Sequence, residues 1–69
     1  MAVINHLKEI RIQKHINQSD LAFAIGSSRK SIGYIERGER YPSIEMALRI
    51  AAYLEVGIDE LFILEESGN

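Results

Sequence analysis

Apolar residues return at helical spacing along most of this chain, and the pattern divides it into five helices. The first helix ends near residue 14, and its apolar positions are Ile4, Leu7, Ile10 and Ile12. A second, shorter helix carries the stripe Leu21, Ala22 and Ile25, and the inner face of a third consists of Ile32 and Ile35. The longest stripe, on a fourth helix, consists of Ile44, Ala47, Leu48, Ala51 and Leu54. A fifth, short helix contains Ile58, Leu61 and Phe62. Since these approximate helical spacings place most of each set on one helix face, the sequence predicts an all-α five-helix bundle.

Polar residues and glycines mark where these helices begin and end. Asn17, Ser28 and Ser43 precede the second, third and fourth helices, in the N-cap position that such side chains favour. Gly26 and Gly38 follow the second and third helices, where a residue with positive φ commonly ends a helix. The helix boundaries are therefore predicted by local chemistry as well as by periodicity.

The two ends of the apolar pattern are not helical. Residues 2–4 and 62–65 are short, rich in apolar residues, and contain several side chains that favour strands. We expect these segments to pair as a small terminal β-ribbon. Because no repeat, low-complexity segment or linker interrupts the pattern, we expect residues 1–69 to form a single domain.

Composition excludes several classes of protein. The 69 residues include no Cys, which excludes disulfides and cysteine-based zinc sites. The longest apolar runs are a few residues, far below the ~20 that a membrane helix needs, and no signal peptide is evident. We therefore expect a cytoplasmic protein without a membrane partner. His6 and His15 lack further ligands at metal-binding spacing, and no nucleophile–base pair or phosphate-binding glycine loop occurs. We accordingly expect no metal, no cofactor, no small-molecule ligand and no enzyme activity.

Charge is distributed unevenly along the chain. The net charge is −2, but residues 41–69 carry −5 and residues 29–40 carry +2. The charged residues of this basic segment are Arg29, Lys30, Arg37 and Arg40 against Glu36 and Glu39. Screening over about 8 Å at physiological salt lets such a local patch act despite a negative total. The asymmetry predicts one face for an anionic partner and an acidic remainder that is kept away from it.

The second and third predicted helices are joined by residues 26–28, which is the spacing of a helix-turn-helix. The outward face of the third helix consists of Arg29, Gly33 and Arg37, with Lys30 and Tyr34 in the adjacent row. A DNA major groove about 12 Å wide admits one α-helix, and Arg and Lys reach base edges or phosphates there. Gly33 lowers the stability of a helix by roughly 1 kcal/mol relative to alanine. We interpret its presence as allowing the backbone of this helix to approach DNA closely. The pattern favours double-stranded DNA as the partner.

Residues 7–62 resemble the Cro/phage-repressor, or XRE-type, helix-turn-helix family. The resemblance rests on LKEIR in the first helix and on the pattern Q..LA..IG.SR.SI..IERG...PS...AL.IA..L.V..DELF, and covers about four-fifths of the chain. It implies a five-helix DNA-binding domain that acts as a transcriptional regulator. It further implies a repressor that binds as a homodimer to an inverted repeat.

The resemblance also assigns roles to particular residues. The third helix becomes the recognition helix, with Arg29, Lys30 and Tyr34 as base-reading residues and Gly33 between them. The positions assigned to phosphate contacts are Asn17, Gln18, Ser28, Ser31, Arg37 and Arg40. Glu36 matches a position that usually bonds inside the domain instead of to DNA.

This chain departs from the family pattern at a few positions. Ser27 stands where an apolar residue is frequent, so we expect a less firmly anchored turn. Gly33 and Tyr34 stand where Ser and a basic or amide residue are frequent, so the base preference of other members does not carry over. Glu55 replaces a glycine or other small residue after the fourth helix, and we expect strain at that corner.

A single recognition helix covers few base pairs, so we expect a dimer, whose interface must come from this domain. Its predicted apolar contacts are Tyr53, Ile58, Phe62, Ile63 and Leu64. Two alternatives remain open on the sequence alone. One is an antitoxin or adaptor that binds a protein, with DNA binding secondary; the other is an architectural protein that binds DNA without sequence preference.

Overall fold

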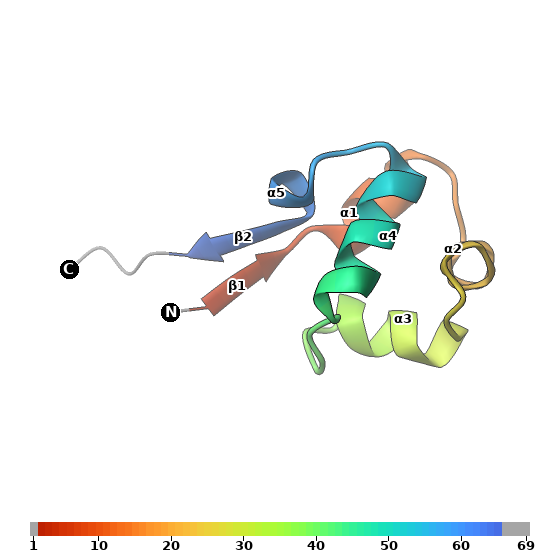
Figure 1. The fold of residues 1–69 in the computed structure, drawn as a ribbon, viewed down its shortest axis with the longest axis horizontal. Helices are drawn as coiled ribbons and strands as arrows, with labels where there is room; N and C mark the ends of the chain where they lie inside the picture. Colours follow the sequence, from red (N-terminus) through yellow and green to blue (C-terminus); the bar gives the residue numbers. More distant parts are fainter. Residues whose placement is uncertain (1, 66–69) are drawn as a thin grey trace.

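The computed structural model describes residues 2–65 of the 69. Along the chain the elements are β1 (Ala2–Asn5), α1 (Leu7–Gln13), α2 (Gln18–Ile25), α3 (Arg29–Glu36), α4 (Ile44–Leu54), α5 (Ile58–Leu61) and β2 (Phe62–Glu65). The helices gather at one end of the molecule, and β1 and β2 lie side by side at the other (Figure 1). The predicted fold class, a five-helix bundle with a small terminal ribbon, is confirmed.

The predicted N-caps and helix-ending glycines adopt the geometry that their residue types favour. The side chains of Asn17, Ser28 and Ser43 each accept a hydrogen bond from the backbone N–H three residues later, at 2.7–3.1 Å. Gly26 and Gly38 both have φ of 75°, which glycine adopts without the steric penalty of a Cβ atom. Local sequence therefore sets the limits of α2, α3 and the start of α4.

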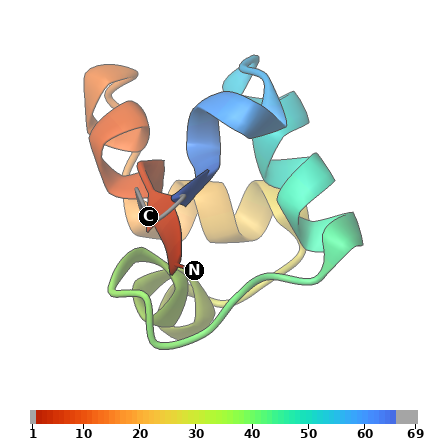
Figure 2. The same cartoon turned by 90° about the vertical axis from the view of Figure 1, so that its left-hand side faces the viewer.

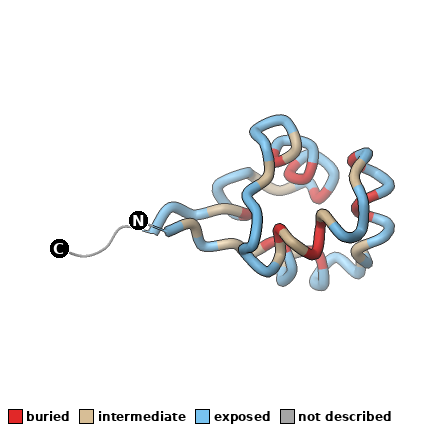
Figure 3. Tube along the Cα trace, turned by 90° about the horizontal axis from the view of Figure 1, so that it is seen from below, coloured by how far each residue is buried: buried red, intermediate tan, exposed pale blue. Residues whose placement is uncertain are grey.

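All five helices of the described range contribute to one apolar core. The largest fully buried side chains are Leu7, Leu21, Ile32, Ile50, Leu54 and Leu61. Figure 3 shows the buried positions as short segments within the helices, while the ribbon is exposed or half-buried. The side chains predicted to join α2 to α3 are indeed buried: Leu21, Ala22, Ile25, Ile32 and Ile35. This packing fixes α3 against α2 independently of any partner.

The prediction for the apolar stripe of α4 is wrong at two positions. Ile44 is 80% exposed and Leu48 is 54% exposed, whereas Ile50, absent from the predicted stripe, is fully buried. Periodicity places Leu48 and Ile50 on the two flanks of Ala47 and Ala51, and it does not tell which flank meets the core. In the structure the core meets the Ile50 flank, so the other flank of α4 remains an exposed apolar surface.

The ribbon is a two-stranded antiparallel sheet that is tied to the helices through Asn5. Its register pairs Ala2 with Glu65 and Asn5 with Phe62, so Phe62 begins β2 and does not extend α5. The Asn5 amide donates to the carbonyl of Ile35 in α3 and its oxygen accepts from the Leu7 N–H at 2.8 Å. Seen along the ribbon in Figure 2, α1, α3, α4 and α5 are arranged around its base.

Glu55 ends α4 in the left-handed region, with φ 59° and ψ 45°. This conformation supports the strain expected from the sequence, because a Cβ atom is unfavourable there.

We predict that Glu55→Gly will raise the free energy of unfolding by about 1 kcal/mol, and with it the melting temperature by about 4–8 °C. Thermal unfolding followed by circular dichroism measures the change. Glu55→Ala is the control: it keeps the Cβ atom and should give no gain, and equal gains for both variants would contradict the backbone explanation.

Candidate nucleic-acid interface

The outward face of α3 is built by its cap and by its packing against α2. Ser28 caps the helix, so Arg29 and Lys30 fall in its first turn and are exposed. Ile32 and Ile35 point inward to the core. In Figure 1, α2 is seen end-on while α3 runs across the view, which is the crossed arrangement of a helix-turn-helix.

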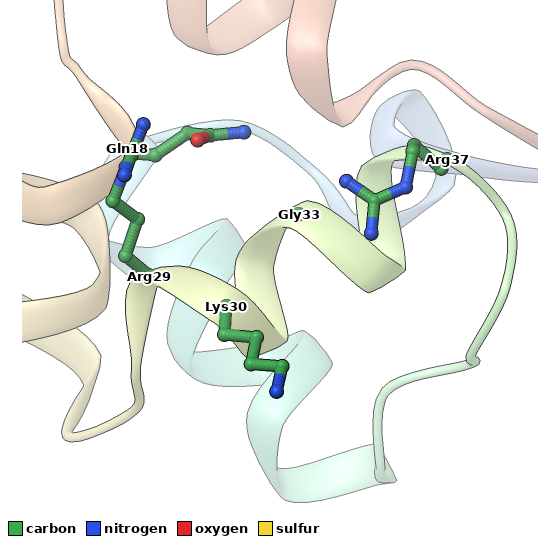
Figure 4. Close-up of a pocket in the computed structure, with 5 residues that line it drawn as sticks. All are labelled: Gln18, Arg29, Lys30, Gly33 and Arg37. Atoms are coloured by element: carbon green, nitrogen blue, oxygen red, sulfur yellow. The ribbon is translucent and has the colours of Figure 1, made fainter.

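An open hollow of about 460 Å³ lies along this face, between α3 and the start of α2. It is lined by Gln18, Arg29, Lys30, Gly33 and Arg37. Figure 4 shows Arg29 extending toward Gln18, Lys30 pointing the other way, and the guanidinium of Arg37 turned back toward Gly33. Three of the predicted base-reading residues thus lie together with two residues that were predicted to contact phosphates.

Tyr34 is surrounded by cations. Lys30 Nζ lies 6.0 Å from the centre of the ring, Arg37 Cζ 5.3 Å and Arg40 Cζ 4.8 Å. At these distances the ring quadrupole attracts positive charge. The half-buried ring of Tyr34 therefore helps to hold the three cationic side chains beside it. Base reading by Tyr34 itself stays a prediction.

Glu36 is removed from this surface by an ion pair. Arg11 Nε lies 2.6 Å from Glu36 Oε2, Arg11 Nη2 donates to Oε1 at 3.1 Å, and Gln18 Nε2 donates to Oε1 at 2.9 Å. The side chains of Arg11 and Glu36 are only 9% and 3% exposed. Arg11 also donates to the carbonyl of Ile16 at 2.9 Å. The expectation that Glu36 bonds inside the domain is confirmed, and its negative charge is neutralised away from the α3 face.

Sequence reasoning missed Arg11 as the partner of Glu36. The two residues are 25 positions apart, so no local pattern joins them. A signal was nevertheless present: Arg11 lies four positions after the buried Leu7 and therefore on the inner face of α1. A charged residue at such a position requires a partner of opposite charge.

Glu39 is paired with Arg37, one of the cations of this surface. It accepts from Arg37 Nε at 2.9 Å and from Nη2 at 3.4 Å. This hydrogen bond lowers the pKa of the Glu39 carboxyl and raises the pKa of Arg37, and the attraction between the two charges adds to both shifts. Glu39 is consequently ionised at neutral pH, and the charge of Arg37 is partly balanced within the protein.

The remaining residues predicted to contact phosphates lie outside the hollow. Asn17 and Ser28 use their side-chain oxygens as N-caps, and the Ser28 hydroxyl also donates to Ser31 Oγ at 3.0 Å. Arg40 lines a smaller depression with Ser31 and Tyr41. Phosphate contact by these residues stays a prediction.

A second, mostly apolar hollow of about 410 Å³ lies on another part of the surface. Its lining residues are Val3, Tyr41, Pro42, Ser43, Ile44, Ala47, Ile58, Asp59 and Phe62; we call it the apolar groove. Ile58 and Phe62, predicted for a dimer contact, belong to it. Tyr53 does not, since it follows Ile44 by nine positions and so lies on the opposite side of α4.

Ile63 and Leu64, also predicted for the dimer, are 39% and 57% exposed on β2. The sequence did not indicate Tyr41 or Ile44 as part of this surface, because they read as a turn residue and a core residue.

Other sites are not indicated within residues 2–65. This range holds no group of three or more His, Cys, Asp or Glu side chains able to bind a metal ion. No helix in the same range is long and apolar enough to cross a membrane.

A helix held across its neighbour by a short turn, with cations and no acidic side chain lining its outer hollow, defines a DNA-binding helix-turn-helix protein. The chain belongs to the helix-turn-helix family of XRE/Cro type (HTH_3), which it matches over residues 7–61. It is thus a DNA-binding transcriptional regulator and not an enzyme. The resemblance drawn from the sequence motifs is confirmed.

Relatives and solved structures agree with this assignment. An uncharacterized HTH-type transcriptional regulator of Methanocaldococcus jannaschii is 40% identical over 62 residues, which are 90% of this chain and 94% of that protein. The restriction-modification controller protein C.AhdI from Aeromonas hydrophila has a similar crystal structure, with a TM-score of 0.77 and 38% identity, over 83% of this chain and 86% of that one. The N-terminal DNA-binding domain of SinR from Bacillus subtilis gives a TM-score of 0.74 and 29% identity, over 93% and 91%.

Proposed function

We propose that this regulator is a homodimeric repressor that reads an inverted repeat through two copies of α3. The observation that carries the proposal is the hollow on α3, where Arg29, Lys30 and Arg37 gather while Glu36 is buried against Arg11. Arg29 and Lys30, in the first turn of α3, are of the residue types that bind the O6 and N7 atoms of guanine. Two such helices about 34 Å apart match one turn of DNA, so a two-fold dimer reads two half-sites.

Phosphate contacts in this proposal come from residues at one end of the hollow and beyond it. Gln18 lies at the start of α2 beside Arg29 (Figure 4), and Arg40 follows α3. Such contacts set the position of a protein on the duplex, whereas contacts to base edges supply the sequence preference. A protein held at a promoter in this way represses transcription by blocking access to that DNA.

The direct test is selection of bound duplexes from a randomised pool at near-physiological salt. An enriched inverted repeat with half-sites about one turn apart would support a sequence-reading dimer. Enrichment of a single, unrepeated half-site would reject the dimer but would still support sequence-specific binding. A pool that passes through without enrichment would favour the adaptor or architectural alternatives. Measuring DNA affinity at several salt concentrations distinguishes these two alternatives, because an architectural protein would bind all duplexes with a steep salt dependence.

The dimer contact in this proposal is the apolar groove. Ile44 is 80% exposed, Tyr41 72% and Ile58 40%, and exposed apolar side chains clustered in this way are typical of protein–protein contacts. A two-fold interface uses the same patch on both copies. The groove contains Asp59 but no basic side chain, so it is not suited to DNA.

We predict that Ile44→Glu will weaken dimerisation by at least tenfold. Full burial of an isoleucine contributes about 1.5–3 kcal/mol, and the change occurs twice in a two-fold interface. Sedimentation equilibrium measures the dissociation constant. Ile12→Glu is the matched control, since Ile12 is 53% exposed on α1 and lies outside the groove. Equal effects of the two variants, or an unchanged dimer in Ile44→Glu, would place the interface elsewhere.

A further inference from the structure

The guanidinium of Arg37 occupies the place of a missing side chain on α3. Gly33 lies on the outward face, yet it is buried. A Cβ atom built on Gly33 would come within 3.1 Å of Arg37 Nη1 and within 4 Å of two other guanidinium atoms. Side chains on a helix point toward its N-terminus, so a residue four positions later covers the preceding turn. Gly33 therefore makes room for the guanidinium of Arg37 in the middle of the α3 face (Figure 4).

Two neighbours hold Arg37 in this position. Glu39 accepts from Nε at 2.9 Å and from Nη2 at 3.4 Å. The ring of Tyr34 lies 5.3 Å from Cζ. A guanidinium has five N–H donors, of which the carboxylate takes one on each of two nitrogens. Both donors of Nη1 and one of Nη2 remain, and these form the end of the fork that turns toward the hollow.

We infer that Arg37 reads a base edge, with guanine as the partner, through the space that Gly33 leaves, and that Glu39 is the residue that positions it. This deepens the proposed function and rests on it. It also replaces the role assigned to Arg37 from the sequence, which was contact with a phosphate. The donors that remain on Nη1 and Nη2 match the O6 and N7 acceptors that guanine presents in the major groove. Since Glu39 balances part of its charge and holds its guanidinium in place, Arg37 is better suited to act as an oriented hydrogen-bond donor than as a free counter-charge to phosphate.

Arg37→Lys separates the two roles because it keeps the charge and removes the planar fork. The binding site is the inverted repeat obtained by selection, together with its single base-pair substitutions. Base reading predicts that Arg37→Lys loses discrimination at one base pair in each half-site, by roughly 5- to 150-fold. The salt dependence and the affinity for random duplex should stay as in the unsubstituted protein. Full retention of discrimination at every position would overturn the inference and restore the phosphate role.

Arg49→Lys serves as the control for the same change outside the hollow, because Arg49 lies on α4 and pairs there with Glu45. It should leave discrimination intact. A loss at the same base pair in Arg49→Lys would also overturn the inference. Circular dichroism before binding confirms that each variant is folded, as expected for an Arg37 side chain that is 56% exposed.

Glu39→Gln tests the positioning role. Release of Arg37 predicts weaker discrimination at the same base pair, together with tighter binding to random duplex because one negative charge is lost. Glu45→Gln is matched to it: Glu45 forms an exposed pair with Arg49 at 2.6 Å on α4, away from the hollow. If Glu39→Gln retains full discrimination, Glu39 does not position Arg37.

The outcomes distinguish this inference from the proposed function. If the unsubstituted protein enriches no sequence, the proposed function fails and the base-reading role of Arg37 fails with it. If the protein enriches an inverted repeat and Arg37→Lys reads it equally well, only the inference fails.

Discussion

Replacing Arg11 with methionine is expected to lower the free energy of unfolding by about 3–5 kcal/mol, the usual loss when a buried ion pair loses one partner. The Glu36 side chain is 3% exposed, so without Arg11 its carboxylate would stay buried with Gln18 as its remaining side-chain donor. A domain of 69 residues has a total stability of roughly 3–10 kcal/mol. The loss is a large share of that total, so the variant should unfold at a much lower urea concentration than the unsubstituted protein, as measured by circular dichroism.

Two further variants test whether the buried charge is the cause. Arg11→Met combined with Glu36→Leu removes both charges and should recover much of the loss, since apolar replacements of buried pairs are often neutral or stabilising. Arg49→Met breaks the exposed pair with Glu45 and should cost less than about 1 kcal/mol. A loss below about 1 kcal/mol for Arg11→Met would contradict the interpretation of the pair as a buried, mutually dependent unit.

Simultaneous replacement of Arg29 and Lys30 by alanine is expected to abolish most sequence-specific DNA binding. Contacts from Arg or Lys to base edges contribute about 1–3 kcal/mol each, which is roughly 5- to 150-fold in affinity per contact. Both residues are exposed in the first turn of α3, so the fold should be preserved. Fluorescence anisotropy on the selected duplex measures the loss, with random duplex as the reference.

The control removes the same charge elsewhere. Lys8 and Lys14 are exposed and do not line the hollow, so their joint replacement by alanine should leave the preference for the selected site unchanged. Uniform losses on selected and random duplexes in the Arg29 and Lys30 variant would reject base reading and leave only phosphate contact. A protein partner that still binds this variant would support the adaptor alternative.

Much of the fold was predictable because its signals are local. Asn17, Ser28 and Ser43 cap helices by hydrogen bonds that span three residues. Gly26 and Gly38 end helices through their own backbone conformation. Interactions at such short separation depend little on the rest of the molecule, so the residue types suffice to predict them.

The candidate site was predictable in outline for a related reason. The exposed face of α3 follows from the helical period once Ile32 and Ile35 are assigned to the core. The period could not show which cations lie together, since that depends on side-chain conformations. Arg37 folds back over Gly33, whereas Arg40 lines a separate depression with Ser31 and Tyr41.

The sequence by itself determined the order of the helices, the limits of α2 and α3, the start of α4 and the basic face of α3, because each depends on neighbours within about one or two turns. Only the tertiary structure decided that Arg11 meets Glu36 across 25 positions and that Ile50, not Leu48, enters the core. It also decided that residues of β1, α4 and α5 share one apolar groove. These features depend on how the helices pack against one another, and packing selects one of several arrangements that the same periodic pattern allows.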